Sequence, residues 1–180
     1  MDESADLEKA KRVVIDAKTQ YPSACNAVET LLIHKDFKYT TELLKALEEA
    51  GVELIAKPES WHTEYSDKIL SYKLVSTLEE AIEHINEYSS GHTESIITED
   101  NKNAKIFMNA VDSAGVYHNV STRFADGFRY GFGAEVGIST NKTHARGPVG
   151  LEGLTIYKYN IEGNGDIAVS YTHLRAHETD

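Results

Sequence analysis

The sequence has one cysteine, no long apolar run and no cluster of basic residues, and each shortage excludes a class of protein. A single thiol, Cys25, cannot form a disulfide within the chain or build a Cys₂ or Cys₄ zinc site. The longest apolar runs, such as Leu31–Ile33, are far too short to cross a bilayer. With a net charge of −11 and no Lys/Arg-rich segment, the chain would be repelled by nucleic acid and by anionic membranes. An anionic small molecule stays a candidate ligand, because arginines inside a pocket can overrule the net charge.

The remaining composition is that of a folded protein. The chain has 180 residues, 41% of them hydrophobic, which predicts one domain with its own core, or a domain with a smaller appendage. The first residues, Met1–Ser4, are acidic and polar and do not resemble a signal peptide. We therefore expect a soluble protein of the cytoplasm.

Helix and strand patterns alternate along the first two thirds of the chain. Helical spacing of apolar residues predicts helices over residues 7–17, 41–50, 78–88 and 102–111. Ser4 or Asp6 is placed to cap the first helix, and Thr77 with Glu80 has the capping-box spacing. Short apolar runs predict strands over residues 30–33, 52–56, 69–75, 95–98 and 115–119. This alternation predicts an α/β fold, with a largely parallel sheet and flanking helices.

The pattern changes from Ser121 to Gly153, where glycines crowd and helical periodicity disappears. Such a segment lets the backbone approach a ligand closely, although a long irregular connection between two subdomains fits the pattern equally well. Residues 155–162 alternate like an isolated strand, which has to pair with its own sheet or with the edge of a neighbouring subunit. Residues 170–180 are polar and patternless and resemble translated cloning-adaptor sequence, so they carry no interpretation here.

Cys25 lies at a junction, after a helix that ends before Pro22 and before the strand that starts at Thr30. A lone cysteine is most often a small buried hydrophobe. On a turn of this kind, however, the sulfur can face a cleft in which backbone N–H groups and cations favour the thiolate. A thiolate attacks activated acyl carbons and forms a thioester that a hydride can reduce. Cys25 is therefore the candidate catalytic nucleophile.

Three blocks of the sequence are informative together. They are residues 21–32, which contain Tyr-Pro-Ser-Ala-Cys-Asn; residues 90–94 with 98–100; and residues 111–114, 119–127, 133–140 and 144–152. Their order and spacing, from about Asp6 to Gly165, resemble the C-terminal, cysteine-bearing part of gamma-glutamyl phosphate reductases. These enzymes belong to the aldehyde dehydrogenase superfamily.

The resemblance implies an NADPH-dependent reduction of L-glutamyl 5-phosphate to L-glutamate 5-semialdehyde and phosphate, in proline biosynthesis. Cys25 would attack the acyl phosphate and carry the acyl group as a thioester, with its own backbone N–H as one oxyanion donor. No metal is needed. A dinucleotide-binding half precedes the cysteine in this family, and no counterpart is present here. The resemblance therefore implies a fragment that is inactive alone.

The resemblance also suggests which residues bind substrate and cofactor. Ser121, Thr122 and Arg123 are candidate substrate-binding residues, because a guanidinium pairs bidentately with carboxylate or phosphate. Arg123 could equally tie the glycine-rich loop to Asp126 or Glu135. Glu64 matches the superfamily glutamate that contacts the nicotinamide ribose, and the alternative is a solvated loop carboxylate.

Other polar residues receive structural interpretations. Arg146 is expected to anchor a loop. His92, His118 and His144 lack the spacing of metal ligands, so they are expected to be structural or solvent-facing.

By resemblance, residues 1–150 form the catalytic thiol domain with glycine-rich substrate loops, and residues 151–169 form an oligomerisation segment that reaches a neighbouring subunit. We expect a homo-oligomer with a functional link to glutamate 5-kinase. One alternative is the reductase module of a fused glutamate kinase and reductase. The other is a non-catalytic oligomerisation remnant, against which Cys25 in an undisturbed motif argues.

Overall fold

The structure, a computed structural model, describes residues 1–168 and contains four helices and seven strands. The helices are α1 (Leu7–Thr19), α2 (Thr40–Glu49), α3 (Leu78–Tyr88) and α4 (Asn101–Ala110). The strands are β1 (Thr30–His34), β2 (Glu53–Ile55), β3 (Ile69–Val75), β4 (Thr93–Ile96), β5 (Gly115–His118), β6 (Gly137–Ser139) and β7 (Gly147–Val149). Short 3₁₀ turns cover Thr122–Phe124 and Glu152–Leu154. All four expected helices are present within about two residues of their predicted bounds.

Side-chain caps begin three of the helices, two of them at predicted residues. Asp6 accepts a hydrogen bond from the Lys9 N–H at the start of α1, and Thr77 accepts one from the Glu80 N–H at the start of α3. Asp100 accepts from the second and third N–H groups of α4. These bonds satisfy N–H groups that have no partner within the helix, so the local sequence specifies where each helix begins.

The predicted α/β class is confirmed, but the parallel strands fall into two sheets and not one. The first sheet has the order β1-β3-β2 and the second pairs β4 with β5, all in parallel. The two sheets meet at the first two residues of the chain. Met1 exchanges hydrogen bonds with Leu32 and His34 of β1, and the Asp2 N–H donates to the Ile97 carbonyl just after β4. Backbone of residues 1–2 thus occupies the position between β1 and β4.

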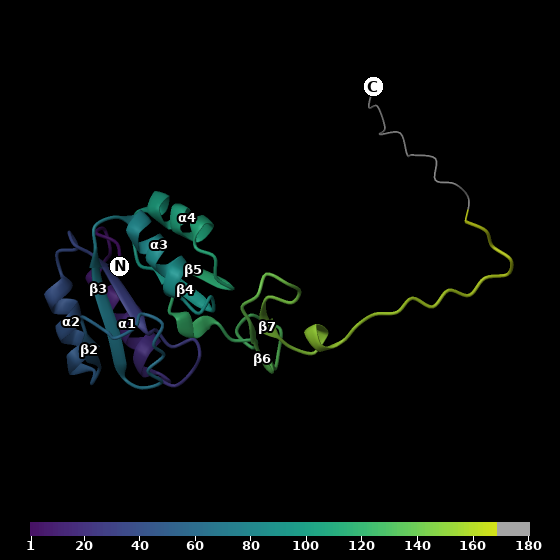
Figure 1. Cartoon of the computed structure of the whole chain (residues 1–180), viewed down its shortest axis with the longest axis horizontal. Coiled ribbons are helices and arrows are strands. Elements are labelled where there is room, and N and C mark those ends of the chain that lie inside the picture. Colours follow the sequence, from purple (N-terminus) through teal and green to yellow (C-terminus); the bar gives the residue numbers. More distant parts are fainter. Residues whose placement is uncertain (169–180) are drawn as a thin grey trace, which may run out of the picture.

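Apolar packing holds the helices to the sheets. The larger buried cluster joins α1 and α2 to the first sheet, through Ala10, Val14, Leu43, Leu47, Ile33 and Leu70. The smaller one joins α3 and α4 to the second sheet, through Ile82, Ile96, Phe107 and Val111. Figure 1 shows the two halves side by side, with α1 and α2 at one end and α3 and α4 at the other.

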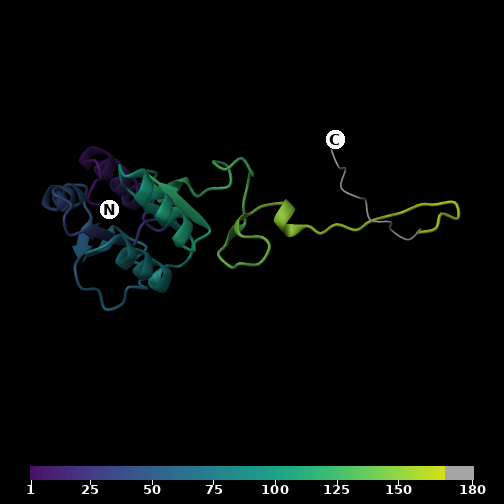
Figure 2. The same ribbon diagram turned by 90° about the horizontal axis from the view of Figure 1, so that it is seen from above.

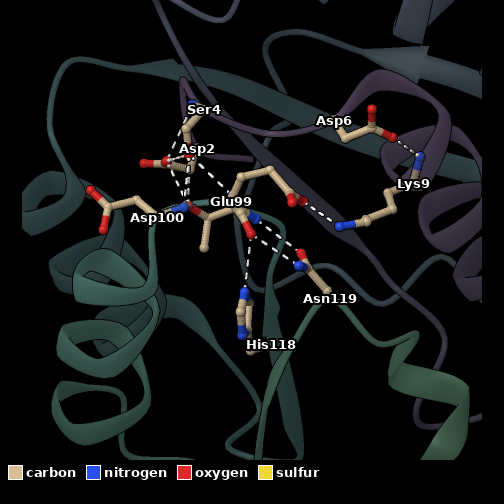
Figure 3. A network of polar contacts seen from close by, with 9 residues as sticks. Asp2, Ser4, Asp6, Lys9, Glu99, Asp100, His118 and Asn119 are labelled. Atoms are coloured by element: carbon tan, nitrogen blue, oxygen red, sulfur yellow. Dashed lines mark hydrogen bonds and ion pairs between the residues drawn. The ribbon is translucent and has the colours of Figure 1, made fainter.

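A polar network fastens residues 1–6 to the loop before α4 (Figure 3). Both Ser4 and Thr98 donate a hydroxyl hydrogen bond to Asp2 Oδ2, at 2.6 and 2.7 Å. Although burial raises the pKa of Asp2, its hydrogen bonds from Ser4, Thr98 and Asn103 bring it below the usual value. The N–H groups of Glu99 and Asp100 donate to Ser4 Oγ. These contacts join the two sheets at their shared edge.

Residues after 125 differ from the sequence-based prediction in two ways. β6 and β7 form an antiparallel hairpin inside the glycine-rich segment, which had been expected to be irregular. Residues 155–162 are exposed and form no strand with any sheet in 1–168, so pairing with the chain's own sheet is excluded; pairing with the edge of a neighbouring subunit stays a prediction. Figures 1 and 2 both show this segment running away from the helices and sheets. The predicted foreign tail, residues 170–180, lies outside the described residues.

No helix within residues 1–168 is long and apolar enough to span a membrane.

Candidate active site around Cys25

Cys25 is presented on a tight turn between α1 and β1. The Ala24 N–H donates to the Tyr21 carbonyl at 3.1 Å, and the Ala27 N–H donates to the Ala24 carbonyl at 2.9 Å. These two turns leave the cysteine exposed while Asn26 and Ala27 are buried beneath it. The Cys25 N–H has no acceptor among residues 1–168. A free N–H on the nucleophile's own residue has the chemistry of an oxyanion donor.

The turn opens into a cavity of about 420 Å³, a size suited to a small metabolite. Its wall includes the Cys25 turn, the loop between β2 and β3, the start of β4 and the 3₁₀ turn after β5, together with parts of α1, β1 and α3. The chemically useful lining residues are Cys25, Asn26, Glu64, His92, Glu94 and Thr122. The cavity therefore brings together residues from all three sequence blocks.

His92 lies directly against the cysteine. Its Nε2 is 3.3 Å from Cys25 Sγ, and its Nδ1 is 2.7 Å from Thr93 Oγ1. Burial lowers the pKa of His92 below its usual value, an effect that the nearby Glu64 carboxylate partly opposes. The imidazole is consequently neutral at pH 7 and able to accept a proton. His92 is buried beside the thiol, so of its two expected places, structural or solvent-facing, the solvent-facing one is excluded.

A buried ion pair lies behind the cysteine turn. Lys18, at the end of α1, is fully buried, and its Nζ contacts Glu29 Oε2 at 2.8 Å. Burial raises the pKa of Glu29, while hydrogen bonds from Lys18 and from the N–H groups of Tyr65 and Ser66 oppose that rise. Ser66 has a φ of +53°, an uncommon conformation for a residue with a side chain. The pair thus fixes the loop that carries Glu64 against the cysteine turn.

The predicted substrate residues Ser121 and Thr122 lie under this turn. Thr122 Oγ1 donates to the Asn26 carbonyl at 2.6 Å, and Asn26 Nδ2 donates to the Ala125 carbonyl at 2.8 Å. Ser121 Oγ accepts from the Arg123 N–H at 3.3 Å and caps the 3₁₀ turn. Both hydroxyls are therefore engaged with backbone, which holds the turn after β5 against the cysteine.

The third member of that set, Arg123, reaches toward the end of α1. Its Nε donates to Gln20 Oε1 at 3.1 Å, and its guanidinium lies 5.9 Å from the centre of the Tyr21 ring. Among the described ion pairs none includes Arg123, so the alternative tie to Asp126 or Glu135 is not formed. The guanidinium therefore stands beside the cysteine turn with N–H groups still available for an anion.

Glu64 fits the role of a ribose-binding carboxylate. It is exposed, lines the cavity, and lies on the loop that also faces His92. Its oxygens accept no hydrogen bond from another residue in the described chain. A carboxylate accepts readily from the two hydroxyls of a ribose, so the residue present suits a nicotinamide nucleotide.

A second carboxyl, Glu94, lines the same cavity and was not predicted. Ser89 Oγ donates to it at 2.5 Å. Burial raises the pKa of Glu94 to about 7, although hydrogen bonds from Ser89 and Ser113 lower it.

Arg146, the predicted loop anchor, donates to Asp112 at 3.0 Å and so ties the hairpin region to the end of α4.

No metal site was predicted. Within residues 1–168, one group of side chains has ligand atoms within 4.8 Å of one another, namely Glu3, His34 and Asp36. This group lies at the C-terminal end of β1, whereas Cys25 precedes the N-terminal end of that strand. It shares no residue with the constellation around the cysteine.

Comparison with known proteins shows which families this chain resembles. A model of the aldehyde dehydrogenase family matches residues 56–135, a stretch that includes Glu64, His92 and Ser121–Arg123. A gamma-glutamyl phosphate reductase of Trichodesmium erythraeum is 56% identical, over 96% of this chain and 44% of that protein. The crystal structure of the Thermotoga maritima reductase superposes with a TM-score of 0.86 at 48% identity, over 93% of this chain and 44% of that one. The Saccharomyces cerevisiae reductase gives a TM-score of 0.58 at 43% identity, over 73% of this chain and 37% of that one.

By sequence and by fold, this chain is a relative of the gamma-glutamyl phosphate reductases. The predicted resemblance and the aldehyde-dehydrogenase-like fold are thereby confirmed. The chain spans less than half the length of the reductases it matches, about 44%.

Three parts of the site escaped prediction from the sequence of this reductase relative. The Lys18–Glu29 pair carries no signal, because burial of a charged side chain depends on packing and not on spacing. His92 is 67 positions from Cys25 and lacks metal-ligand spacing. The one available signal for His92 and Glu94 is their place inside the second block.

Proposed function

We propose that this chain carries the thiol half of a gamma-glutamyl phosphate reductase site. The reaction is the NADPH-dependent reduction of L-glutamyl 5-phosphate to L-glutamate 5-semialdehyde and phosphate in proline biosynthesis. The observation that supports it most is the Cys25 turn, which opens into a small-molecule cavity within a chain 56% identical to a reductase.

The chemistry begins at Cys25. Its sulfur attacks the acyl carbon, the C–O bond to phosphate breaks, and the acyl group becomes a thioester. The oxygen of the tetrahedral intermediate accepts a hydrogen bond from the Cys25 N–H, which has no acceptor within residues 1–168. A bound nicotinamide cofactor would supply the hydride to the thioester carbon, and Glu64 would hold the ribose of that cofactor. Breakage of the C–S bond then releases the aldehyde and the Cys25 thiolate.

Substrate binding is assigned to Ser121, Thr122 and Arg123. Arg123 pairs with the carboxylate or phosphate of the substrate, since its guanidinium is next to the cysteine turn and forms no ion pair there in the described chain. Thr122 and Ser121 hold the segment in place through their backbone contacts. Residues 1–150 act as the catalytic thiol domain, and residues 151–169 act as an oligomerisation segment of a homo-oligomer. We propose a cytoplasmic location as well. The substrate would come from glutamate 5-kinase, either as a separate protein or as a kinase fused to the reductase.

A chimera tests this function. Residues 1–168 replace the matching segment of the Trichodesmium erythraeum reductase, and NADP⁺ reduction is followed with glutamate 5-semialdehyde, with and without phosphate. We expect phosphate-dependent turnover that Cys25→Ser lowers by at least about a thousandfold, as for other nucleophile deletions. The chain alone is expected to be inactive.

Two outcomes would contradict the proposal. Turnover without phosphate would make the site an aldehyde-oxidising one. A folded chimera that binds NADPH but shows no turnover would make the chain a non-catalytic oligomerisation remnant. NADH assayed in parallel decides the cofactor preference.

A further inference from the structure

His92 touches the reacting atom of the proposed mechanism but has no role in it so far. We propose that His92 is a catalytic residue, the base that takes the proton of the Cys25 thiol as its sulfur bonds to the acyl carbon. This assignment rests on the proposed function only for the identity of the acyl group. The proton transfer itself belongs to the Cys25–His92 pair.

The geometry suits proton transfer in one direction. Nε2 lies 3.3 Å from Sγ, within hydrogen-bond distance for sulfur, and Nδ1 lies 2.7 Å from Thr93 Oγ1. With Nδ1–H donating to the threonine hydroxyl, Nε2 carries the lone pair and faces the thiol. Thr93 is thus a third group that orients the base, as is found where a histidine activates a thiol or a hydroxyl.

The polypeptide around His92 is built to hold the ring in place. Gly91, with a φ of +73°, makes the turn that precedes it, and the Gly91 N–H donates to Ser89 Oγ at 2.7 Å. The Ala114 and Gly115 N–H groups donate to the carbonyls of Gly91 and His92. The ring is therefore held by β4 and β5, while the thiol is held by the turn after α1.

The charges facing His92 agree with the role of a base. The titratable groups facing it are the Cys25 thiol, on the turn after α1, and the Glu64 carboxylate, on the loop between β2 and β3. Burial keeps the ring neutral before the reaction, and the carboxylate stabilises the imidazolium that forms. The thiol proton moves to Nε2 as the S–C bond forms, and the C–O bond breaks when the tetrahedral intermediate collapses, which releases phosphate.

The test uses iodoacetamide, which makes the same S–C bond and expels iodide, so neither cofactor nor substrate is needed. Cys25 is the only cysteine in the chain, and labelling therefore reports one site. His92→Gln keeps an uncharged hydrogen-bonding group near Sγ but cannot take up the proton. His34→Gln is the matched control at a distant histidine, and Cys25→Ser sets the background.

We expect labelling at pH 7 to be about tenfold slower in His92→Gln than in the unchanged chain, because an unassisted thiol is only a few per cent ionised there. The difference should disappear near pH 10, where an ordinary thiol, with a pKa of about 8.5, ionises without help. His34→Gln should match the unchanged chain at both values. A purely structural role would slow labelling equally at pH 7 and pH 10, and that result, or no difference at pH 7, overturns the proposal.

A second measurement does not depend on the folding of a variant. The ¹³Cε1 resonance of His92 is titrated in the unchanged chain before and after alkylation of Cys25. A shift in the midpoint on alkylation supports a shared proton, and an unchanged midpoint contradicts it. If both tests support His92 as the base while the chimera shows no turnover, the proposal for His92 holds and the reductase assignment is wrong. If the chimera turns over and His92→Gln is labelled as fast as the unchanged chain, only the proposal for His92 is wrong.

Discussion

Residues 1–125 and residues 126–168 use their apolar side chains in opposite ways. Every buried hydrophobic residue of the described chain lies between Ala5 and Ala125. Past that point most large apolar side chains are exposed, including Phe128, Phe132, Ile156, Tyr157 and Ile161. The first region contains helices and parallel strands that cover one another, whereas the second has one hairpin and an extended segment. The difference shows that apolar residues form a core only where paired strands and packed helices bring their side chains together.

The largest expected effect compares one core residue with one exposed residue. Leu43→Ala removes a fully buried side chain of α2, and we expect a loss of about 3 kcal/mol in the free energy of unfolding. Ile156→Ala removes a side chain that is 96% exposed and should change it by less than about 0.5 kcal/mol. Urea unfolding of the chain measures both. Equal losses would mean that Ile156 is packed in solution and that the contrast is not real.

The next effect concerns the buried charges of the first region. Glu29→Gln leaves the Lys18 ammonium buried without its partner and should cost about 3 kcal/mol in urea unfolding. The double variant Lys18→Met with Glu29→Gln should recover at least half of that loss, because no buried charge remains. The exposed pair Lys45–Glu49 is the control, and its removal should cost less than about 1 kcal/mol. A single variant as stable as the unchanged chain would show that the pair is solvated.

A smaller effect depends on pH. The pKa of Glu94 rises from its usual 4.5 to about 7 in the folded chain, so ionisation of this carboxyl opposes folding. The protonated form of Glu94 is favoured in the folded chain; its contribution to stability is fully present below pH 4.5 and is lost as the pH rises through 7. Relative to Glu94→Gln, the unchanged chain should therefore lose stability between pH 4.5 and 8, on the order of 3 kcal/mol.

Urea unfolding at both pH values measures this difference. Glu162→Gln, at an exposed position of the second region, should leave the pH dependence as it is in the unchanged chain. A pH dependence that survives Glu94→Gln would assign it to another group.

The smallest effect concerns the link between the two regions. Lys142 and Arg146 pair with Asp112, and these two side chains lower its pKa below the usual value. Asp112→Asn should speed amide hydrogen exchange severalfold over residues 136–149 without changing exchange in α1 or β3. Asp16→Asn on α1 is the control. Unchanged exchange in the hairpin would show that β6 and β7 hold themselves together without this contact.

Most of the first region was predictable because its signals are local. Asp6, Thr77 and the apolar spacing of α1 to α4 act within a few residues, so the helices were found at nearly the right positions. β4 begins two residues before the predicted strand, since Thr93 and Glu94 are polar but face the cavity. In the second region an alternating pattern at 155–162 predicted a strand, but a strand also needs a paired neighbour, which a local pattern does not provide.

The sequence by itself determined the α/β class, the positions of the helices and the place of Cys25 on a turn, because spacing, caps and Pro22 act through neighbouring residues. Only the tertiary structure decided that His92 contacts the thiol, that a buried Lys18 pairs with a half-buried Glu29, and that Arg123 turns to Gln20 and not to Glu135. Such contacts join residues that are distant in the chain, and they depend on which strands become neighbours. No local pattern of residue types specifies that.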